Sequence, residues 1–134
     1  HSPDSSYDIS GFEYWTGVYG EGHPNQSLGR HKDKDELHWK RTGGVEGGEI
    51  IRPEIGTVYY PMSTEHDGGY LEIERSNGEV ERIEPKFNRL VIFDAGNDAH
   101  SVTKVTNGVR YAIAINLWRV VPVAVQEGLM TIEK

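Results

Sequence analysis

Apolar and polar residues alternate along much of the chain, which is the pattern of strands with one buried face. Short apolar and aromatic runs also favour strands, and turn residues such as Gly, Asn and Asp separate them roughly every ten residues. Together these signals predict strands at residues 12–19, 28–33, 55–62, 70–75, 79–83, 89–93, 100–105 and 109–118. No segment has the periodicity of a long helix. We therefore expect an all-β fold of the β-sandwich or jelly-roll type, with few or no helices.

Two stretches between these strands lead to separate predictions. Asn107-Gly108 is a residue pair that favours a two-residue turn, because both residues tolerate positive φ. It predicts a tight hairpin that joins the strands 100–105 and 109–118. Segment 37–48 lacks periodicity and is rich in glycine, which predicts a mobile surface loop. With Trp39 this loop is a candidate lid over a substrate, and a loop without that role is the alternative.

The length of 134 residues predicts a single domain with a substantial core. We assign residues 12–134 to this domain. The chain starts with His-Ser-Pro-Asp-Ser-Ser, so residues 1–11 are expected to be disordered or derived from a tag. We see no signal peptide and no apolar run near the roughly 20 residues of a membrane span. A membrane partner is therefore not expected, and a cytoplasmic location is the default.

Charge and cysteine content narrow the possible functions. Lysine and arginine total 14 against 21 acidic residues, which gives a net charge of −7. This balance argues against nucleic acid or an anionic membrane as a partner. The absence of cysteine excludes a disulfide framework, a thiolate metal site and a cysteine nucleophile. The oligomeric state is left open.

Four residues form a pattern typical of a metal site beside an anion-binding pocket. His31 and Asp33 form a His-x-Asp sequence on a predicted strand, where residues two apart face the same side. His100 adds a second imidazole, and two imidazoles with one carboxylate occupy one face of an octahedral iron(II) and leave its other positions open. Arg110 lies among apolar strand residues, where an unpaired guanidinium is costly. We expect a carboxylate to meet it there.

Each candidate residue also has an alternative interpretation. His31 is alternatively a solvated histidine beside a charged run, and Asp35 or Glu36 is an alternative to Asp33 as the carboxylate. His100 is alternatively a core histidine, and Arg110 the partner of a buried acid. The remaining internal histidines are expected to be solvated loop residues: His23, His38 and His66.

Five longer segments resemble one known family: RHKDKDE, TVYYPM, DGGYLEI, IEPKFNRLVIF and HSVTKVTNGVRYAIAINLW. They are similar, in this order, to motifs of the prolyl 4-hydroxylase group of iron(II)- and 2-oxoglutarate-dependent dioxygenases. The segment before His100 is especially similar to the hypoxia-sensing prolyl hydroxylases. The resemblance covers residues 14–118. It implies a double-stranded β-helix, a jelly-roll or cupin-like fold, with the metal near one mouth.

The resemblance also implies a role for each candidate. His31, Asp33 and His100 would hold Fe(II), and Arg110 would bind the distal carboxylate of 2-oxoglutarate. Tyr60 matches a family tyrosine that reaches the same carboxylate, with a plain core aromatic as the alternative. The implied enzyme is a hydroxylase that uses O₂ and 2-oxoglutarate and releases succinate and CO₂, with ascorbate as a further candidate cofactor. The expected substrate is a prolyl residue in a peptide. A small metabolite or free amino acid is the alternative substrate, and a non-catalytic, metal-retaining binding module is the alternative function.

Overall fold

The computed structural model describes residues 8–128, which fold mostly into antiparallel strands. The strands are β1 (Gly11–Gly20), β2 (Leu28–His31), β3 (Ile55–Tyr59), β4 (His66–Asp67), β5 (Leu71–Glu74), β6 (Val80–Ile83), β7 (Leu90–Phe93), β8 (Ala99–Val102) and β9 (Asn107–Trp118). The described residues also form two short helices, α1 (Glu36–Arg41) and α2 (Val123–Gln126), and the 3₁₀ turn η2 (Gly44–Glu46). None of these helices is long and apolar enough to cross a membrane.

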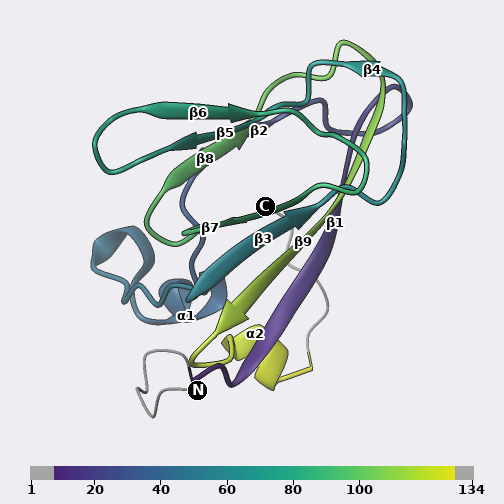
Figure 1. The fold of residues 1–134 in the computed structure, drawn as a ribbon. Helices are drawn as coiled ribbons and strands as arrows, with labels where there is room; N and C mark the ends of the chain where they lie inside the picture. Colours follow the sequence, from purple (N-terminus) through teal and green to yellow (C-terminus); the bar gives the residue numbers. More distant parts are fainter. Residues whose placement is uncertain (1–7, 129–134) are drawn as a thin grey trace.

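The strands form two sheets that face one another (Figure 1). The five-stranded sheet has the order β1-β9-β3-β7, with β4 paired to one end of β9. The four-stranded sheet has the order β2-β8-β5-β6, and every strand pair in both sheets is antiparallel. Successive strands therefore often change sheet, as they do in a jelly roll. The predicted all-β, jelly-roll fold is confirmed.

The core lies between the two sheets because the strands alternate in burial, as the sequence pattern indicated. In β5 and β7 every second residue is buried, so their apolar side chains point into the space between the sheets. The buried cluster consists of Tyr60, Leu71, Ile73, Val91, Phe93, Ala95 and Ala112. Burial of one such large side chain contributes about 1.5–3 kcal/mol, so this cluster holds the two sheets together.

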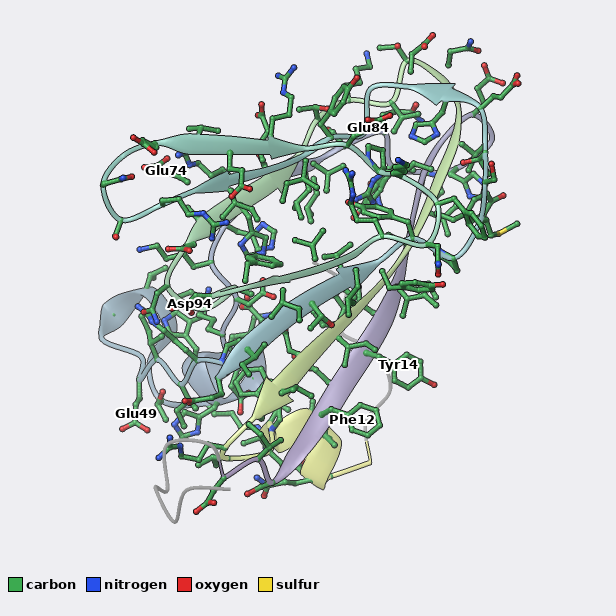
Figure 2. All side chains as sticks on the ribbon, viewed as in Figure 1. Phe12, Tyr14, Glu49, Glu74, Glu84 and Asp94 are labelled. Carbon is green, nitrogen blue, oxygen red and sulfur yellow. The ribbon has the colours of Figure 1, made fainter. Side chains whose placement is uncertain are left out.

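The outer face of the five-stranded sheet is also apolar. Phe12 and Tyr14 project from β1 away from the core (Figure 2), and Leu90 and Ile92 project from β7. Each of these four side chains is more than half exposed. Apolar side chains thus lie on both faces of this sheet, but those on the outer face are exposed.

The predicted hairpin between residues 100–105 and 109–118 is wrong, since β8 and β9 lie in different sheets. Asn107 and Gly108 are instead the first residues of β9, where they pair with Asp67 and His66 of β4. Gly108 does have positive φ, at 72°. The reason is a close approach, because a Cβ at this position would lie 2.1 Å from the Glu65 carbonyl oxygen.

The segment 37–48, predicted to be an irregular loop, contains most of α1 and all of η2. Asp35 caps α1, because its carboxylate accepts a hydrogen bond of 3.0 Å from the His38 backbone N–H. The other Asp35 oxygen accepts a hydrogen bond of 2.9 Å from the Val123 N–H at the start of α2. Arg41 of α1 also forms an ion pair with Glu127, so the segment is tied to the C-terminal part of the fold.

Several boundaries differ from the predicted ones by a few residues. β2 ends at His31, so Asp33 lies just beyond the strand, and Tyr60 likewise follows the end of β3. Gly11, which the sequence analysis placed before the domain, is the first residue of β1. Of the stretch expected to precede the domain, residues 1–7 lie outside the described part of the chain.

Candidate active site

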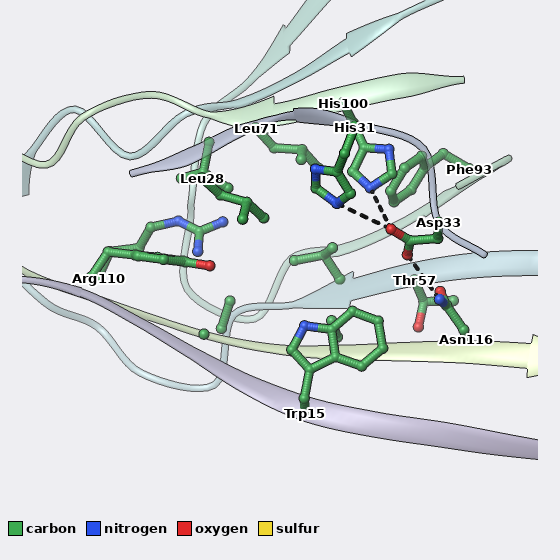
Figure 3. A pocket seen from close by; sticks show the side chains of 16 residues that line it. Trp15, Leu28, His31, Asp33, Thr57, Leu71, Phe93, His100, Arg110 and Asn116 are labelled. Carbon is green, nitrogen blue, oxygen red and sulfur yellow. Dashed lines mark hydrogen bonds and ion pairs between the residues drawn. The ribbon is translucent and has the colours of Figure 1, made fainter. Parts of the chain in front are cut away.

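His31, Asp33 and His100 lie together at one end of a pocket between the two sheets (Figure 3). One ligand atom from each side chain lies within 4.8 Å of the other two. The Asp33 Oδ1 atom is 3.1 Å from His31 Nε2 and 3.3 Å from His100 Nε2. The structure therefore brings together the two imidazoles and the carboxylate that the sequence singled out.

Sheet pairing positions the two histidines. His31 of β2 and His100 of β8 are directly opposite one another in an antiparallel ladder, where facing side chains lie on the same side of the sheet. Their ring centroids are 4.4 Å apart, and the ring of Phe93 packs edge-on against His100. Asp33 is held by its backbone N–H, which donates to the Ala95 carbonyl oxygen at 2.8 Å.

Backbone carbonyl groups determine which ring nitrogen of each histidine faces Asp33. His31 Nδ1 lies 2.8 Å from the Gly29 carbonyl oxygen, and His100 Nδ1 lies 2.9 Å from the Asp98 carbonyl oxygen. A carbonyl oxygen only accepts hydrogen bonds, so Nδ1 of each ring carries the hydrogen and donates the hydrogen bond. In the neutral imidazoles, Nε2 then presents its lone pair to the centre of the cluster, which is the tautomer a metal ligand requires.

The donor set fits a divalent transition metal. Two Nε2 lone pairs and a carboxylate oxygen converge on one small region, and three acceptor atoms this close favour a cation among them. Two imidazoles and one carboxylate on one side suit iron(II) with open positions on the other side. Asp33 and His100 are buried, which limits competition from water.

Asn116 of β9 completes the cluster from the opposite sheet. Its side-chain Nδ2 donates a hydrogen bond of 2.8 Å to Oδ2 of Asp33, and both residues are buried. The sequence analysis did not single out Asn116. The only signal was a polar residue on the same face as Arg110 in the mainly apolar segment 109–118.

The pocket extends from the metal-ligand cluster to Arg110 and contains about 500 Å³ of space, with its open mouth included. Figure 3 shows the cluster at one end, Arg110 at the other, and the indole of Trp15 below the space between them. The intervening walls are mainly apolar and come from both sheets: Leu28, Leu71, Val102, Val58, Ala112 and Ala114. Such a shape suits a small molecule with an anionic end and an apolar middle.

Arg110 is almost fully buried, with 2% of its surface exposed. Its Nε donates to the Gly69 carbonyl oxygen at 2.9 Å, and its Nη2 donates to the Tyr60 hydroxyl at 3.3 Å. The rings of Tyr19 and Tyr60 flank the guanidinium, at 5.5 Å and 5.2 Å from ring centroid to Cζ. Within residues 8–128, no carboxylate lies at ion-pairing distance from Arg110, which leaves its positive charge for an anion in the pocket.

Both tyrosines beside Arg110 remain protonated at neutral pH. Burial raises the pKa of the Tyr60 hydroxyl above its ordinary value of 10.0, and the charge of Arg110 offsets part of that rise. Burial raises the pKa of Tyr19 in the same way, again with Arg110 acting in the opposite direction. Because the Tyr60 oxygen accepts from Arg110, its own O–H is available to donate to a ligand.

Other expectations about the site fared differently. Asp35, considered as an alternative carboxylate, caps α1 instead. His38 lies on α1 and His66 on β4, so neither is a loop residue as predicted. Trp39, the candidate lid residue, does not line the pocket. Trp15 and Tyr19 also line the pocket, which the sequence did not indicate, because an aromatic strand gives no sign of which cavity its inner face meets.

Comparisons with known proteins identify the family and the fold. The model of the 2OG-Fe(II) oxygenase superfamily matches residues 14–118. A prolyl-4-hydroxylase from Pseudomonas putida is structurally similar, with a TM-score of 0.61 and 22% identity over 86% of this chain and 55% of that one. So is a prolyl hydroxylase from Trichoplax adhaerens, in complex with a peptide fragment of the hypoxia inducible factor oxygen degradation domain, with a TM-score of 0.58 and 25% identity over 83% and 46%.

The chain thus spans about half the length of these two solved structures. No curated protein matches the sequence significantly. The family match covers most of the sequence, and the fold is shared with prolyl hydroxylases. The chain belongs to the 2OG-Fe(II) oxygenase superfamily.

Proposed function

We propose that this 2-oxoglutarate-dependent oxygenase hydroxylates a prolyl residue within a peptide. In this proposal His31, Asp33 and His100 hold Fe(II), and Arg110 with Tyr60 binds the distal carboxylate of 2-oxoglutarate. Membership of the superfamily implies Fe(II), 2-oxoglutarate and O₂. The individual residue roles and the prolyl substrate are the proposed part.

The observation that carries the proposal is the buried guanidinium of Arg110 in the same pocket as the three ligands. A buried charge is costly unless an opposite charge compensates it. Arg110 has hydrogen-bond partners but no carboxylate partner among residues 8–128. A ligand carboxylate in the pocket would supply that charge, and a guanidinium binds it through two parallel N–H bonds.

The protein's own groups prepare the co-substrate end of the pocket. The Gly69 carbonyl fixes Nε of Arg110, so the two Nη groups remain for the carboxylate. The protonated hydroxyl of Tyr60 donates a further hydrogen bond to it. Apolar walls from both sheets exclude water around the middle of the bound diacid, which strengthens the charged contacts at its end.

The metal end needs neutral imidazoles and an ionised carboxylate. Carbonyl groups at Gly29 and Asp98 hold both imidazoles in the tautomer that offers Nε2. Bound there, Fe(II) supplies the oxygen activation that couples decarboxylation of 2-oxoglutarate, with release of succinate and CO₂, to hydroxylation of a C–H bond. The chain's part is to orient the co-substrate between Arg110 and the ligand cluster.

Two findings support a peptidyl proline as the substrate. Two solved structures with a similar fold are prolyl hydroxylases, and one of them is in complex with a peptide fragment. The sequence segments that resemble the family are also most similar to its prolyl-hydroxylase group. A small metabolite or a free amino acid is the competing substrate class, and the experiment below separates the two.

The test is succinate release from 2-oxoglutarate with Fe(II) and O₂ present. Parallel reactions contain a set of proline-containing peptides, the same peptides with alanine in place of proline, free proline, or no substrate. We expect succinate above the uncoupled rate with a proline peptide alone, with a mass gain of one oxygen on that peptide. Stimulation by free amino acids but by no peptide would refute the prolyl-peptide assignment. No succinate under any condition, with no metal binding, would refute the enzyme assignment for this chain.

A further inference from the structure

Asn116 lies behind the carboxylate of Asp33, on the side away from the two imidazoles (Figure 3). The two carboxylate oxygens of Asp33 therefore have different neighbours. Its Oδ1 faces the Nε2 atoms of His31 and His100, and its Oδ2 accepts the Asn116 Nδ2–H. A carboxylate oxygen only accepts when ionised, so the amide must present its nitrogen rather than its oxygen to Asp33.

The backbone around Asn116 is fixed on both sides. Asn116 belongs to the central strand of its sheet and pairs with Gly56 of β3 and Glu13 of β1. A Cβ at Gly56 would lie 2.3 Å from the Ala95 Cβ and 3.2 Å from the Asn116 Oδ1 atom, so the glycine makes room mainly for Ala95 and also relieves the carboxamide. With 2% of Asn116 exposed, water does not compete for the amide. The position of Nδ2 is therefore set by the five-stranded sheet.

We propose that Asn116 is a positioning residue that holds Asp33 as a one-oxygen metal ligand. The proposal rests on the metal site of the proposed function. An aspartate can bind a metal through one oxygen or through both. Engagement of Oδ2 by Asn116 reserves Oδ1 for the metal, so two imidazoles and one oxygen occupy three positions and leave three for the co-substrate and O₂. A two-oxygen aspartate would take one of those three positions.

The proposal predicts a specific effect of Asn116→Leu, which keeps the branched shape of the side chain, with somewhat more bulk, but removes the donor. Asp33 loses the partner that orients it, so affinity for metal should fall by about ten- to a hundredfold, the usual effect of removing a group that orients a ligand. The KM for 2-oxoglutarate should rise as well. Asn116→Ala removes the same donor without adding bulk and should give the same effect if the leucine variant does not fold.

The experiment uses Co(II) as the probe, because its visible absorption reports the number and kind of its ligands. Calorimetric titrations and spectra are recorded for the wild type, both Asn116 variants and His100→Ala. Thr103→Val is the control outside the pocket, since it removes another hydrogen bond to a side chain, from the Tyr70 backbone N–H to Thr103 Oγ1 at 2.9 Å. Thermal unfolding of each metal-free protein separates loss of stability from loss of metal binding.

We expect weaker Co(II) binding and a changed Co(II) spectrum in both Asn116 variants, with Co(II) affinity unchanged in Thr103→Val. If the Asn116 variants unfold at a lower temperature but bind Co(II) with wild-type affinity and spectrum, Asn116 is only structural and the proposal is overturned. In that case the metal site still stands, provided that His100→Ala abolishes binding. If the wild type binds no Co(II), or His100→Ala binds it normally, the metal site of the proposed function fails and the role of Asn116 fails with it.

Discussion

Replacing Arg110 by lysine tests the co-substrate end of the pocket. A guanidinium has five N–H donors. In the structure Nε donates to the Gly69 carbonyl and one Nη2–H to the Tyr60 hydroxyl, so the other Nη hydrogens remain for a ligand. Lysine keeps the positive charge but has three donors at a single point, and it cannot form two parallel bonds to one carboxylate.

The expected size of the effect follows from this difference. Arg110→Lys should lose at least one charged hydrogen bond to the distal carboxylate, which is about 1.5–3 kcal/mol. That corresponds to a weakening of 2-oxoglutarate binding of roughly ten- to a hundredfold. Affinity for the metal should stay nearly unchanged, because none of the hydrogen bonds of Arg110 involves a metal ligand.

The assay is a 2-oxoglutarate titration of succinate release, with calorimetric metal titration beside it. Arg82→Lys is the control, since Arg82 pairs with Glu72 on the exposed side of the four-stranded sheet. Overlapping curves for wild type and Arg110→Lys would show that the carboxylate binds elsewhere. An equal loss of metal affinity would show instead that the substitution disturbs the whole pocket.

Further predictions concern stability. Gly69→Ala should lower the free energy of unfolding more than Gly78→Ala. Both glycines have positive φ, so either substitution should cost roughly 1–2 kcal/mol in backbone strain. Only at position 69 would the new methyl group also meet Arg110, at 2.8 Å from Cδ, so the loss of stability there should be larger. Asp35→Ala should lower the free energy of unfolding by about 1–3 kcal/mol in denaturant titrations, because it removes hydrogen bonds to both helices. The pKa of Tyr60 is raised in the folded protein, so the unfolded chain loses the Tyr60 proton at a lower pH than the fold does. The free energy of unfolding should therefore fall as pH rises above 10.0, and it should fall less steeply in Tyr60→Phe.

Each of these predictions has a clear contrary result. Equal melting temperatures for the two glycine variants would mean that Arg110 moves aside without cost. An unchanged unfolding midpoint in Asp35→Ala would mean that the helices do not depend on the cap. Identical alkaline slopes for wild type and Tyr60→Phe would mean that burial does not disfavour the Tyr60 phenolate.

Local patterns predicted most strands, because burial on one face leaves a two-residue period in the sequence. Strands β5 and β7 show this period most clearly. The patterns did not predict the partners of β9, which pairs with β1, β3 and β4. Asn107-Gly108 was read as a hairpin turn, and Gly108 does have positive φ, but its conformation serves contact with Glu65, 43 positions earlier in the chain. Such a partner cannot be identified from nearby residues.

The candidate site residues were proposed from their chemistry and spacing. Arg110 stands out in an apolar strand, His31 and Asp33 follow from their spacing, and His100 is the imidazole that completes the set of three. Asn116 was missed, since a single amide in a strand has no function until its neighbour across the core is known. Helix α1 was missed for a different reason. The glycines that follow α1 indicated a loop, and this signal outweighed that of Asp35, an ordinary helix cap.

The two ends of the pocket belong to different sheets. His31 and His100 lie on strands of the four-stranded sheet, whereas Arg110 lies on β9 of the five-stranded sheet. Under the proposed function, the distance between the two sheets would therefore set the length of diacid that can bridge the metal and the guanidinium. Leu71 and Phe93 both line the pocket, and Phe93 also packs against His100, so a change in side-chain size at Leu71 would alter that distance without touching a ligand candidate. Under the proposed function, preference between diacids of different length would therefore depend partly on apolar residues of the core.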